Sequence, residues 1–246
     1  MTQLADVNDF IDVSHDVTTE RQLSDALGGI AREMGFDRHS LYRREVAHDR
    51  ASIALTDYPE DWVARVRQRR YYVDDPAYMA SWRTAVGFSS REVGSLLALT
   101  TRQRNILQEA RKADLGEWFA VPAHVANESR GLATFVVCRG RELPERNLPM
   151  AQLVGCFAYE AARRLHRRSE VLAPPPVALT PRQLDCLILV ARGKTDWEIG
   201  AILGVAEDTI GKYMDDARRR YGVSRRSELV VRALYDGHFS LEDAIR

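Results

Sequence analysis

The sequence predicts an α+β fold in two domains, an N-terminal α-β-α sandwich around an antiparallel sheet and a C-terminal all-α domain of four helices. Strand-type and helical segments mix without a regular alternation in the first part of the chain, which favours an antiparallel sheet. Only helical patterns with capping signals follow in the last part. Between them, the segment 169–178 contains three consecutive prolines and predicts an extended linker. The predicted domains are therefore residues 1–168 and 179–246.

Periodicity and composition locate the elements of the first domain. Four segments have the apolar periodicity of helices: 23–34, 61–70, 100–115 and 148–168. Four shorter segments have strand-type composition: 40–44, 52–56, 119–124 and 132–138. The last predicted helix has one side of small apolar residues and a basic C-terminal end. Such a helix can pack on its own domain or on a second copy of the chain.

The first helix of the second domain has a signal at each end. Thr180 can cap a helix that begins at Pro181, where the missing backbone N–H has no cost. Gln183 can reach back to complete a capping box. Gly193 is suited to end this helix, because glycine accepts the left-handed backbone found at helix ends.

A second and a third helix follow at short range. Thr195 and Glu198 repeat the capping-box pattern, and the tripeptide 203–205 (Leu-Gly-Val) predicts a tight turn into the third helix. Short helices joined in this way are typical of a helix-turn-helix DNA-binding unit. In such a unit the helix after the turn enters the major groove.

Charge gives only local support for DNA binding. The net charge is zero, and basic and acidic residues nearly balance across 179–236. Five arginines nevertheless gather at the end of the predicted third helix and the start of the fourth: Arg218, Arg219, Arg220, Arg225 and Arg226. A local cluster is what contact with phosphates requires. A solvated arginine-rich face would produce the same pattern, so this alternative stays open.

Composition excludes several other classes of protein. No segment approaches the roughly 18 consecutive apolar residues of a membrane helix, and the N-terminus is acidic where a signal peptide is basic. We therefore expect a cytoplasmic protein without a membrane partner. Cys138, Cys156 and Cys186 are far apart, so we expect core residues rather than a disulfide framework or a zinc site.

The sequence lacks motifs of catalysis and metal binding. It contains no GxGxxG, GxSxG or HExxH motif, and its six histidines share no ligand-like spacing. The tripeptide 193–195 (Gly-Lys-Thr) resembles the end of a phosphate-binding loop, but Ile188 stands where that loop requires glycine. We therefore expect no catalytic residue, no metal and no enzymatic activity.

Two independent patterns resemble one family. The helix-turn-helix pattern is similar to that of LuxR-type regulators. In the first domain, Tyr58 and Trp62 precede the dipeptide 75–76 (Asp-Pro) with the spacing Tyr-x3-Trp-x12-Asp-Pro, and the segments 120–122 (Ala-Val-Pro) and 131–134 (Gly-Leu-Ala-Thr) follow. This set resembles the autoinducer-binding domain of the quorum-sensing members. The resemblance covers nearly the whole chain, and the first-domain spacing is its more specific part.

The resemblance implies a small-molecule signal and no other cofactor. Ligands of the family are acyl-homoserine lactones. By that resemblance, Trp62 would donate its indole N–H to the lactone carbonyl, and Asp75 would accept the amide N–H. Tyr58 and Thr134 would hold the acyl carbonyl. These roles suit the side chains, because an indole can only donate and an ionised carboxylate can only accept. The alternative is that Tyr58 and Trp62 are core residues and Asp75 only caps a helix at Pro76.

The chain departs from the family pattern around the expected cavity. Val66 stands where the family commonly has tyrosine, and Ser90 stands where it has a second tryptophan. Trp118 and Asp114 stand where glycines are expected. We count Val66, Ser90 and Trp118 among the ligand-binding residues and expect a reshaped cavity. It would suit an aromatic or otherwise unusual acyl group, or a ligand that is not a homoserine lactone.

The expected DNA-reading helix departs as well. Ala206 replaces the usual serine cap, which typically costs about 1 kcal/mol. Gly211 and Asp215 fall at positions that face bases in the family, and an acidic side chain repels phosphate. We therefore expect weak binding or an unusual DNA site. The DNA-binding candidates are Lys194, Thr209, Gly211, Lys212, Asp215, Arg218, Arg219, Arg220, Arg225 and Arg226.

The favoured hypothesis is a ligand-responsive transcriptional regulator that binds a palindromic DNA operator as a homodimer. A palindrome fits a dimer because its two recognition helices must lie about one helical turn apart. The helix predicted at 148–168 is the candidate dimer helix. Two alternatives stay open at this point. The chain could be a dominant-negative partner of another LuxR-type regulator, or an enzyme that turns over acyl-lactones.

Overall fold

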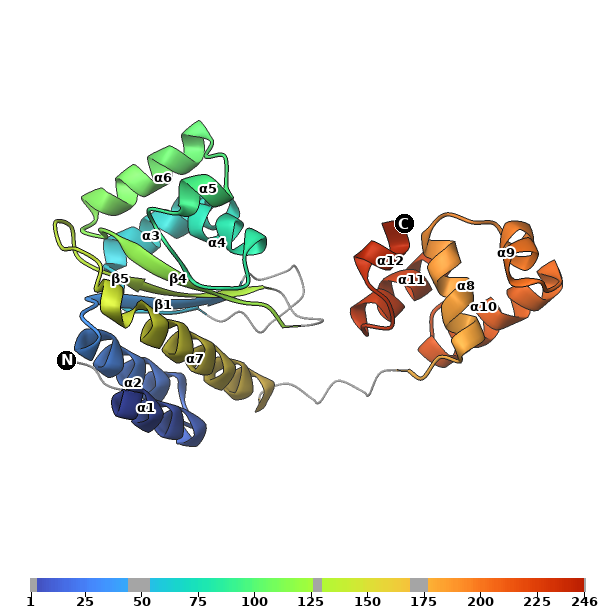
Figure 1. Ribbon diagram of the computed structural model, residues 1–246, viewed down its shortest axis with the longest axis horizontal. Coiled ribbons are helices and arrows are strands. Elements are labelled where there is room, and N and C mark those ends of the chain that lie inside the picture. The colour runs from blue at the N-terminus through green and yellow to red at the C-terminus, as the bar shows by residue number, and fades with distance from the viewer. Residues whose placement is uncertain (1–3, 44–53, 126–129, 169–176, 246) are drawn as a thin grey trace. The chain divides into compact units, whose positions relative to one another are not determined.

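The computed structural model describes residues 4–43, 54–125, 130–168 and 177–245. These belong to two compact units, Met1–Leu172 and Ala173–Arg246 (Figure 1). Most of the predicted linker, 169–176, lies outside the described residues. The two units are described one at a time.

A five-stranded antiparallel sheet with the strand order β2-β1-β5-β4-β3 forms the centre of the first unit. Its strands are β1 (Arg38–Arg43), β2 (Ala54–Thr56), β3 (Phe88–Ser89), β4 (Trp118–Ala123) and β5 (Gly131–Val136). The structure confirms the antiparallel sheet and the four predicted strands within a few residues at each end. The short strand β3 was not predicted.

Helices on both faces of this sheet confirm the predicted sandwich (Figure 1). One face is covered by α1 (Leu4–Asp16), α2 (Glu20–Glu33) and α7 (Leu148–Arg168). The other is covered by α3 (Glu60–Gln68), α4 (Pro76–Ala80), α5 (Val93–Leu96) and α6 (Thr101–Lys112). Three single turns of 3-10 helix lie at Tyr71–Val73, Ser81–Arg83 and Glu145–Asn147. The helix at 148–168 has its predicted bounds. Helix α4 begins at Pro76 with Asp75 as its cap, as one of the two interpretations of the sequence had it, whereas α1 and α5 were not predicted.

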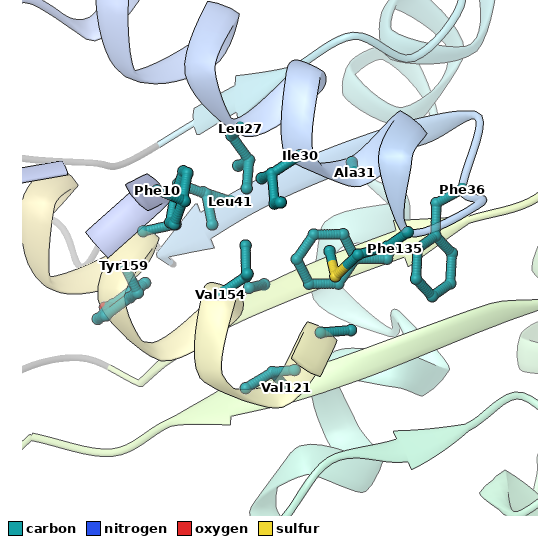
Figure 2. Packing of buried hydrophobic residues seen from close by; sticks show 14 of the residues in the cluster. Phe10, Leu27, Ile30, Ala31, Phe36, Leu41, Val121, Phe135, Val154 and Tyr159 are labelled. Atoms are coloured by element: carbon teal, nitrogen blue, oxygen red, sulfur yellow. The ribbon is translucent and has the colours of Figure 1, made fainter. Parts of the chain in front are cut away.

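The α1-α2-α7 side is a solid hydrophobic core. Figure 2 shows Leu41, Val121 and Phe135 of the sheet packed against Leu27 of α2 and Val154 of α7. Every residue of β5 is buried, because alternate side chains enter the cores on opposite faces. The sheet is therefore fixed from this side.

The second unit consists of five helices in the described part of the chain, one more than predicted. They are α8 (Pro181–Ala191), α9 (Asp196–Leu203), α10 (Glu207–Tyr221), α11 (Arg226–Tyr235) and α12 (Leu241–Ile245). Ile199, Ile210 and Leu229 are fully buried and hold α9, α10 and α11 together. The short α12 is the helix that the sequence did not predict.

The predicted caps of the second unit are confirmed. Thr180 forms a reciprocal capping box with Gln183 at the start of α8. Thr195 and Glu198 form another at the start of α9. Gly204 ends α9 with a positive φ of 69°, which glycine adopts without strain. Ala206 gives α10 no side-chain cap.

The prediction that all three cysteines are core residues is only partly correct. Cys186 is buried, Cys138 is half-buried and Cys156 is exposed on α7. Cys156 therefore lies on a side of the helix that does not face its own domain.

No helix among the described residues is both long and apolar enough to span a bilayer. In the same part of the chain, no group of three or more histidine, cysteine or acidic side chains is arranged to hold a metal ion.

Gly131 gives a test of the packing between β5 and α7. A Cβ atom at this position would lie 2.0 Å from the ring of Tyr159, which is 2% exposed and has no room to move. We expect Gly131→Ala to lower the free energy of unfolding by roughly 1–3 kcal/mol. Gly29→Ala is the control, because nothing lies within 4 Å of its added Cβ and alanine favours a helix by about 1 kcal/mol. Urea denaturation of both variants checks the opposite signs, and an unchanged Gly131→Ala protein would contradict this packing.

Candidate functional site

A cavity of about 710 Å³ lies between the sheet and the α3-α6 layer of the first unit. Of the seven ligand-binding residues predicted from the sequence, six line it: Tyr58, Trp62, Val66, Asp75, Trp118 and Thr134. Helix α3, the residues just before α3 and α4, and the strands β4 and β5 contribute these side chains, so the tertiary fold brings them together. Ser90 is not among the lining residues.

Local structure explains how α3 presents its residues to the cavity. Trp62 and Val66 are four residues apart and therefore lie on the same face of the helix. Tyr58 stands just before α3, and its backbone N–H donates to the Thr56 hydroxyl at 3.2 Å. The opposite wall comes from the sheet, where Thr134 of β5 is paired with Ser40 of β1.

The Tyr58 hydroxyl remains protonated at physiological pH. Burial raises its pKa, and the nearby carboxylates of Asp75 and Asp57 raise it further. A hydrogen bond with the side chain of Thr134 acts in the opposite direction but does not reverse the shift. Tyr58 and Thr134 thus form a pair of hydroxyl groups at the cavity wall, with a proton to donate.

Asp75 has two roles in the geometry. Its Oδ1 accepts a hydrogen bond from the Tyr78 backbone N–H at 2.9 Å and caps α4, which begins at Pro76. Burial raises the pKa of Asp75, and the backbone N–H groups of Tyr78 and Ala77 oppose that rise only in part. No salt bridge with Asp75 occurs among the described residues. The carboxyl group therefore both caps α4 and presents acceptor capacity to the cavity.

Trp62 combines a packed ring with an available donor. Its side chain is 6% exposed, and its ring centroid lies 5.9 Å from that of Tyr71 in a tilted arrangement. Its indole N–H makes no hydrogen bond within the described residues. A donor fixed in this way suits a ligand acceptor, because the ring does not need to be ordered on binding.

Ser90 contacts the backbone of the cavity residue Trp118 and does not line the cavity itself. It lies across from Trp118 at the end of the β3-β4 pair, where its N–H donates to the Trp118 carbonyl at 2.8 Å. The Trp118 N–H in turn donates to the Ser90 hydroxyl at 3.4 Å. Phe88 packs edge-on against the indole of Trp118 at 5.8 Å. The structure thus places Ser90 as a partner of Trp118 rather than in the cavity wall.

Asp114 shows why the family pattern has glycine at this position. Its φ is +61°, a left-handed conformation that side chains rarely adopt. Its carboxylate accepts a hydrogen bond from the Arg139 N–H at 3.1 Å, which helps to hold the strained turn.

The sequence did not indicate several lining residues. Four are tyrosines: Tyr42, Tyr71, Tyr72 and Tyr78. Arg43 and Arg67 also border the cavity. The adjacent tyrosines 71 and 72 are conspicuous in the sequence, but no local rule places them beside Trp62. The described wall is consequently richer in hydroxyl groups and rings than the spacing motif suggests.

The DNA-binding candidates of the second unit separate into two groups. Lys194, Arg225 and Arg226 border an open groove of about 1040 Å³ between the starts of α9 and α11. Within it, Arg226 Nη1 lies 2.6 Å from the carboxylate of Asp196. The basic side chains of this groove are therefore partly neutralised.

The remaining candidates lie on α10. Arg218 pairs with Asp215 and also donates to the Ser224 carbonyl at 2.9 Å, and Arg219 pairs with Asp216. Arg220 donates to the carbonyl of Ala178, just before α8, at 2.9 Å. Its guanidinium therefore already has a hydrogen-bond partner within the unit. Lys212 and Asp215 are exposed, and Thr209 and Gly211 are half-buried. The predicted arginine run thus contacts its own unit rather than forming one free basic patch.

Comparisons with known families agree with the two units. Residues 19–162 match the family model of the autoinducer binding domain, and residues 177–233 match the model described as bacterial regulatory proteins, luxR family.

One relative is of similar length and another is longer. The transcriptional activator protein AhyR of Aeromonas hydrophila is 24% identical over 232 residues, which cover 90% of this chain and 87% of AhyR. The HTH-type transcriptional regulator y4qH of Sinorhizobium fredii is 25% identical over 187 residues, 76% of this chain and only 57% of that longer protein.

Solved structures share the fold. The crystal structure of Escherichia coli SdiA aligns with a TM-score of 0.62 and 21% identity over 96% of this chain and 98% of that chain. CepR2 of Burkholderia cenocepacia aligns with a TM-score of 0.52 and 12% identity over 67% of this chain and 96% of its own.

The raised pKa of Asp75 predicts a pH dependence of stability. A carboxyl group whose pKa is higher in the folded state contributes stability at low pH that is lost as the pH rises through the folded value. Asp75→Asn keeps a cap acceptor without the charge. We therefore expect the ligand-free variant to melt at or above the wild-type temperature at pH 7.5, with the difference shrinking as the pH falls toward about 4.

Asp57→Asn is the matched control for this measurement. Burial tends to raise the pKa of Asp57, but hydrogen bonds from His39 and the charges of His39 and Arg38 outweigh it, so the pKa is lowered. Its ionised form stabilises the fold above the unfolded pKa, and we expect Asp57→Asn to melt below wild type at pH 7.5. Circular dichroism melts from pH 4.5 to 8 compare the two. Strong destabilisation of Asp75→Asn at pH 7.5 would contradict the sign assigned to Asp75.

Proposed function

This chain belongs to the LuxR family of transcriptional regulators with an autoinducer-binding domain, and we propose that its cavity binds an acyl-homoserine lactone or a closely related acyl signal. The observation that carries the proposal is the convergence of Tyr58, Trp62, Asp75 and Thr134 on one cavity. Together they supply an indole donor, a carboxylate acceptor and a pair of hydroxyl groups. An acyl-homoserine lactone needs a partner for its lactone carbonyl, its amide N–H and its acyl carbonyl, which is the same set.

The apolar part of the wall supports an acyl chain. Aliphatic side chains of α3, α6, the α6-β4 connection and the sheet border the cavity: Val63, Val66, Ile106, Leu107, Leu115, Leu132 and Val136. Trp118 adds a rigid ring to this wall. We infer a compact or ring-bearing acyl group, because Trp118 fills space that a longer flexible chain would need.

An empty cavity of this kind leaves the fold weaker than an occupied one. Among the described residues, the buried Asp75 carboxyl group has only backbone N–H donors, and the Trp62 indole N–H has no acceptor. Both groups therefore have hydrogen-bonding capacity that a ligand can satisfy with a gain in free energy. The ligand would then stabilise the first unit in proportion to the logarithm of its concentration above Kd. In this proposal, ligand binding raises the fraction of regulator molecules that are folded.

The second unit is proposed to bind DNA through α10 and the groove between α9 and α11. Lys212, Arg225 and Lys194 are the phosphate-contact candidates that are least engaged within the unit. We propose a homodimer on a palindromic operator, with α7 as a contact between copies. Leu153 and Cys156 on its exposed side support this role.

A thermal-shift panel tests the ligand proposal. The panel holds homoserine lactones with straight and aryl acyl groups, and octanoyl-rac-glycerol, which SdiA binds in a solved structure. We expect at least one lactone to raise the melting temperature of wild type. We expect Asp75→Asn to lose the shift for amide-bearing ligands and Trp62→Phe to lose preference for the lactone ring.

Trp82→Phe is the matched control for the tryptophan variant, because Trp82 is exposed and lies outside the cavity wall. Its shift should equal that of wild type. If Asp75→Asn and Trp62→Phe both kept the wild-type response, the assignment of the cavity would be wrong.

Salt dependence tests direct DNA contact. The affinity for a duplex selected by the ligand-bound protein from a random library should fall steeply with salt, because each neutralised phosphate releases a counterion. We expect Lys212→Ala and Arg225→Ala each to reduce the log-log slope by about 0.9. Lys112→Ala, in the first unit, should leave the slope unchanged. A flat salt response of wild type would contradict phosphate contact.

A further inference from the structure

A buried polar cluster lies at the edge of the sheet where β2 leads into α3. His39 of β1 is 2% exposed, and the side chain of Asp57, just after β2, is 28% exposed. His39 is not a cavity residue, since its side chain belongs to the opposite face of the sheet. The cluster therefore lies behind the wall that carries Tyr58.

The Asp57 carboxylate lies close to both the backbone and the side chain of His39. Its Oδ1 accepts a hydrogen bond from the His39 backbone N–H at 2.7 Å, and its Oδ2 lies 3.2 Å from His39 Nδ1. The Asp57 N–H returns a bond to the His39 carbonyl at 3.3 Å. This arrangement prolongs the β1-β2 ladder, in which Ser40 and Thr56 form the adjacent pair.

Two further contacts carry the constraint forward to Tyr58. The Thr56 hydroxyl donates to the His39 carbonyl at 3.1 Å and accepts from the Tyr58 N–H at 3.2 Å. The backbone on both sides of Asp57 is thereby tied to the backbone of His39, and the imidazole adds its own contact with the Asp57 carboxylate. The next residue, Tyr58, begins the turn into α3.

The imidazole itself has little freedom. A Cβ atom added at Gly28 of α2 would lie 3.3 Å from His39 Cε1, which shows that α2 packs directly over the ring. The hydroxyl of Ser24 lies 3.5 Å from Nε2 on the same side. Arg38 also donates to the Asp57 carbonyl at 3.2 Å. The cluster is enclosed by α2 on one side and by the β2-α3 turn on the other.

The contacts resemble those of a catalytic triad, with the imidazole of His39 between the hydroxyl of Ser24 and the carboxylate of Asp57. The surroundings of these residues do not support catalysis. None of the three residues borders the cavity, and the imidazole is almost fully covered. A nucleophile without access to a substrate has no reaction to perform. The arrangement supports a structural role in recognition.

We propose that His39 is a positioning residue for ligand recognition, which with Asp57 fixes the β2-α3 turn so that the Tyr58 hydroxyl meets Thr134 at the cavity wall. The proposal rests on the proposed function and deepens it, by adding two residues on the far side of the sheet to the group that holds the acyl carbonyl. Thr134 is already fixed, because it pairs with Ser40 beside His39. The β2-α3 turn, which carries Tyr58, lies outside the paired strands, so other contacts must hold it in place.

A double-mutant cycle on ligand-free protein tests the positioning directly. Tyr58→Phe removes the hydroxyl, and His39→Leu removes the imidazole contacts. If His39 positions that hydroxyl, the drop in melting temperature caused by Tyr58→Phe should shrink to less than half in the His39→Leu background. His39→Asn can present an amide N–H near the position of Nδ1 and should restore the full drop. Additive effects would show that His39 only stabilises the sheet edge, and would overturn the proposal.

If His39→Leu does not fold, the same cycle is run with Asp57→Asn in its place. This variant keeps an acceptor for the His39 N–H while removing the charge. A smaller effect of Tyr58→Phe in the Asp57→Asn background than in wild type is again the supporting result, and additive effects are the opposing one.

The ligand measurement uses N-octanoyl-homoserine lactone and aryl-homoserine lactones as probes. We expect His39→Leu to weaken binding about fivefold, the effect of one ordinary hydrogen bond, and to have almost no further effect on Tyr58→Phe. Equal weakening in both backgrounds would overturn the proposal. If wild type binds no lactone, the proposed function fails, while the ligand-free cycle still decides the role of His39.

Discussion

The carboxyl group of Asp75 sets a constraint on which much of the first unit depends. It caps α4 through the Tyr78 N–H and at the same time borders the cavity, in an environment that raises its pKa. Removing this carboxyl group would take away the cap of α4. Keeping it ionised costs free energy, because the backbone N–H groups that donate to it offset its burial only in part. The cavity is therefore a feature that the fold carries at some expense of stability.

The two faces of the sheet divide structure from recognition. On one face, side chains such as Leu41 and Phe135 pack solidly against α1, α2 and α7. On the other face, side chains such as Thr134 and Trp118 border a space that the α3-α6 layer encloses. The solid face holds the strands in register, so the polar groups on the hollow face keep their positions without a ligand.

Local chemistry explains what the sequence could predict. Capping boxes at Thr180 and Thr195 involve only four residues each, so helix starts in the second unit were predicted to the residue. The sandwich also followed from periodicity and composition, whereas the six cavity residues that were predicted followed from the resemblance to the family. Ser90 is not among the lining residues, and its hydrogen bonds with Trp118 depend on strand pairing that no local pattern gives. His39 and Asp57 are 18 residues apart in the chain, and no spacing rule links them.

The paired acids and arginines of α10 have a consequence for how an operator would be found. Asp215 and Asp216 already pair with Arg218 and Arg219, so a phosphate that approaches either guanidinium competes with a carboxylate and is repelled by it. Random genomic DNA offers no base contact to compensate for that exchange, whereas a correct site does. A regulator with such a helix would dwell only briefly on unrelated sequence and would locate its target mainly by repeated dissociation through bulk solution rather than by sliding.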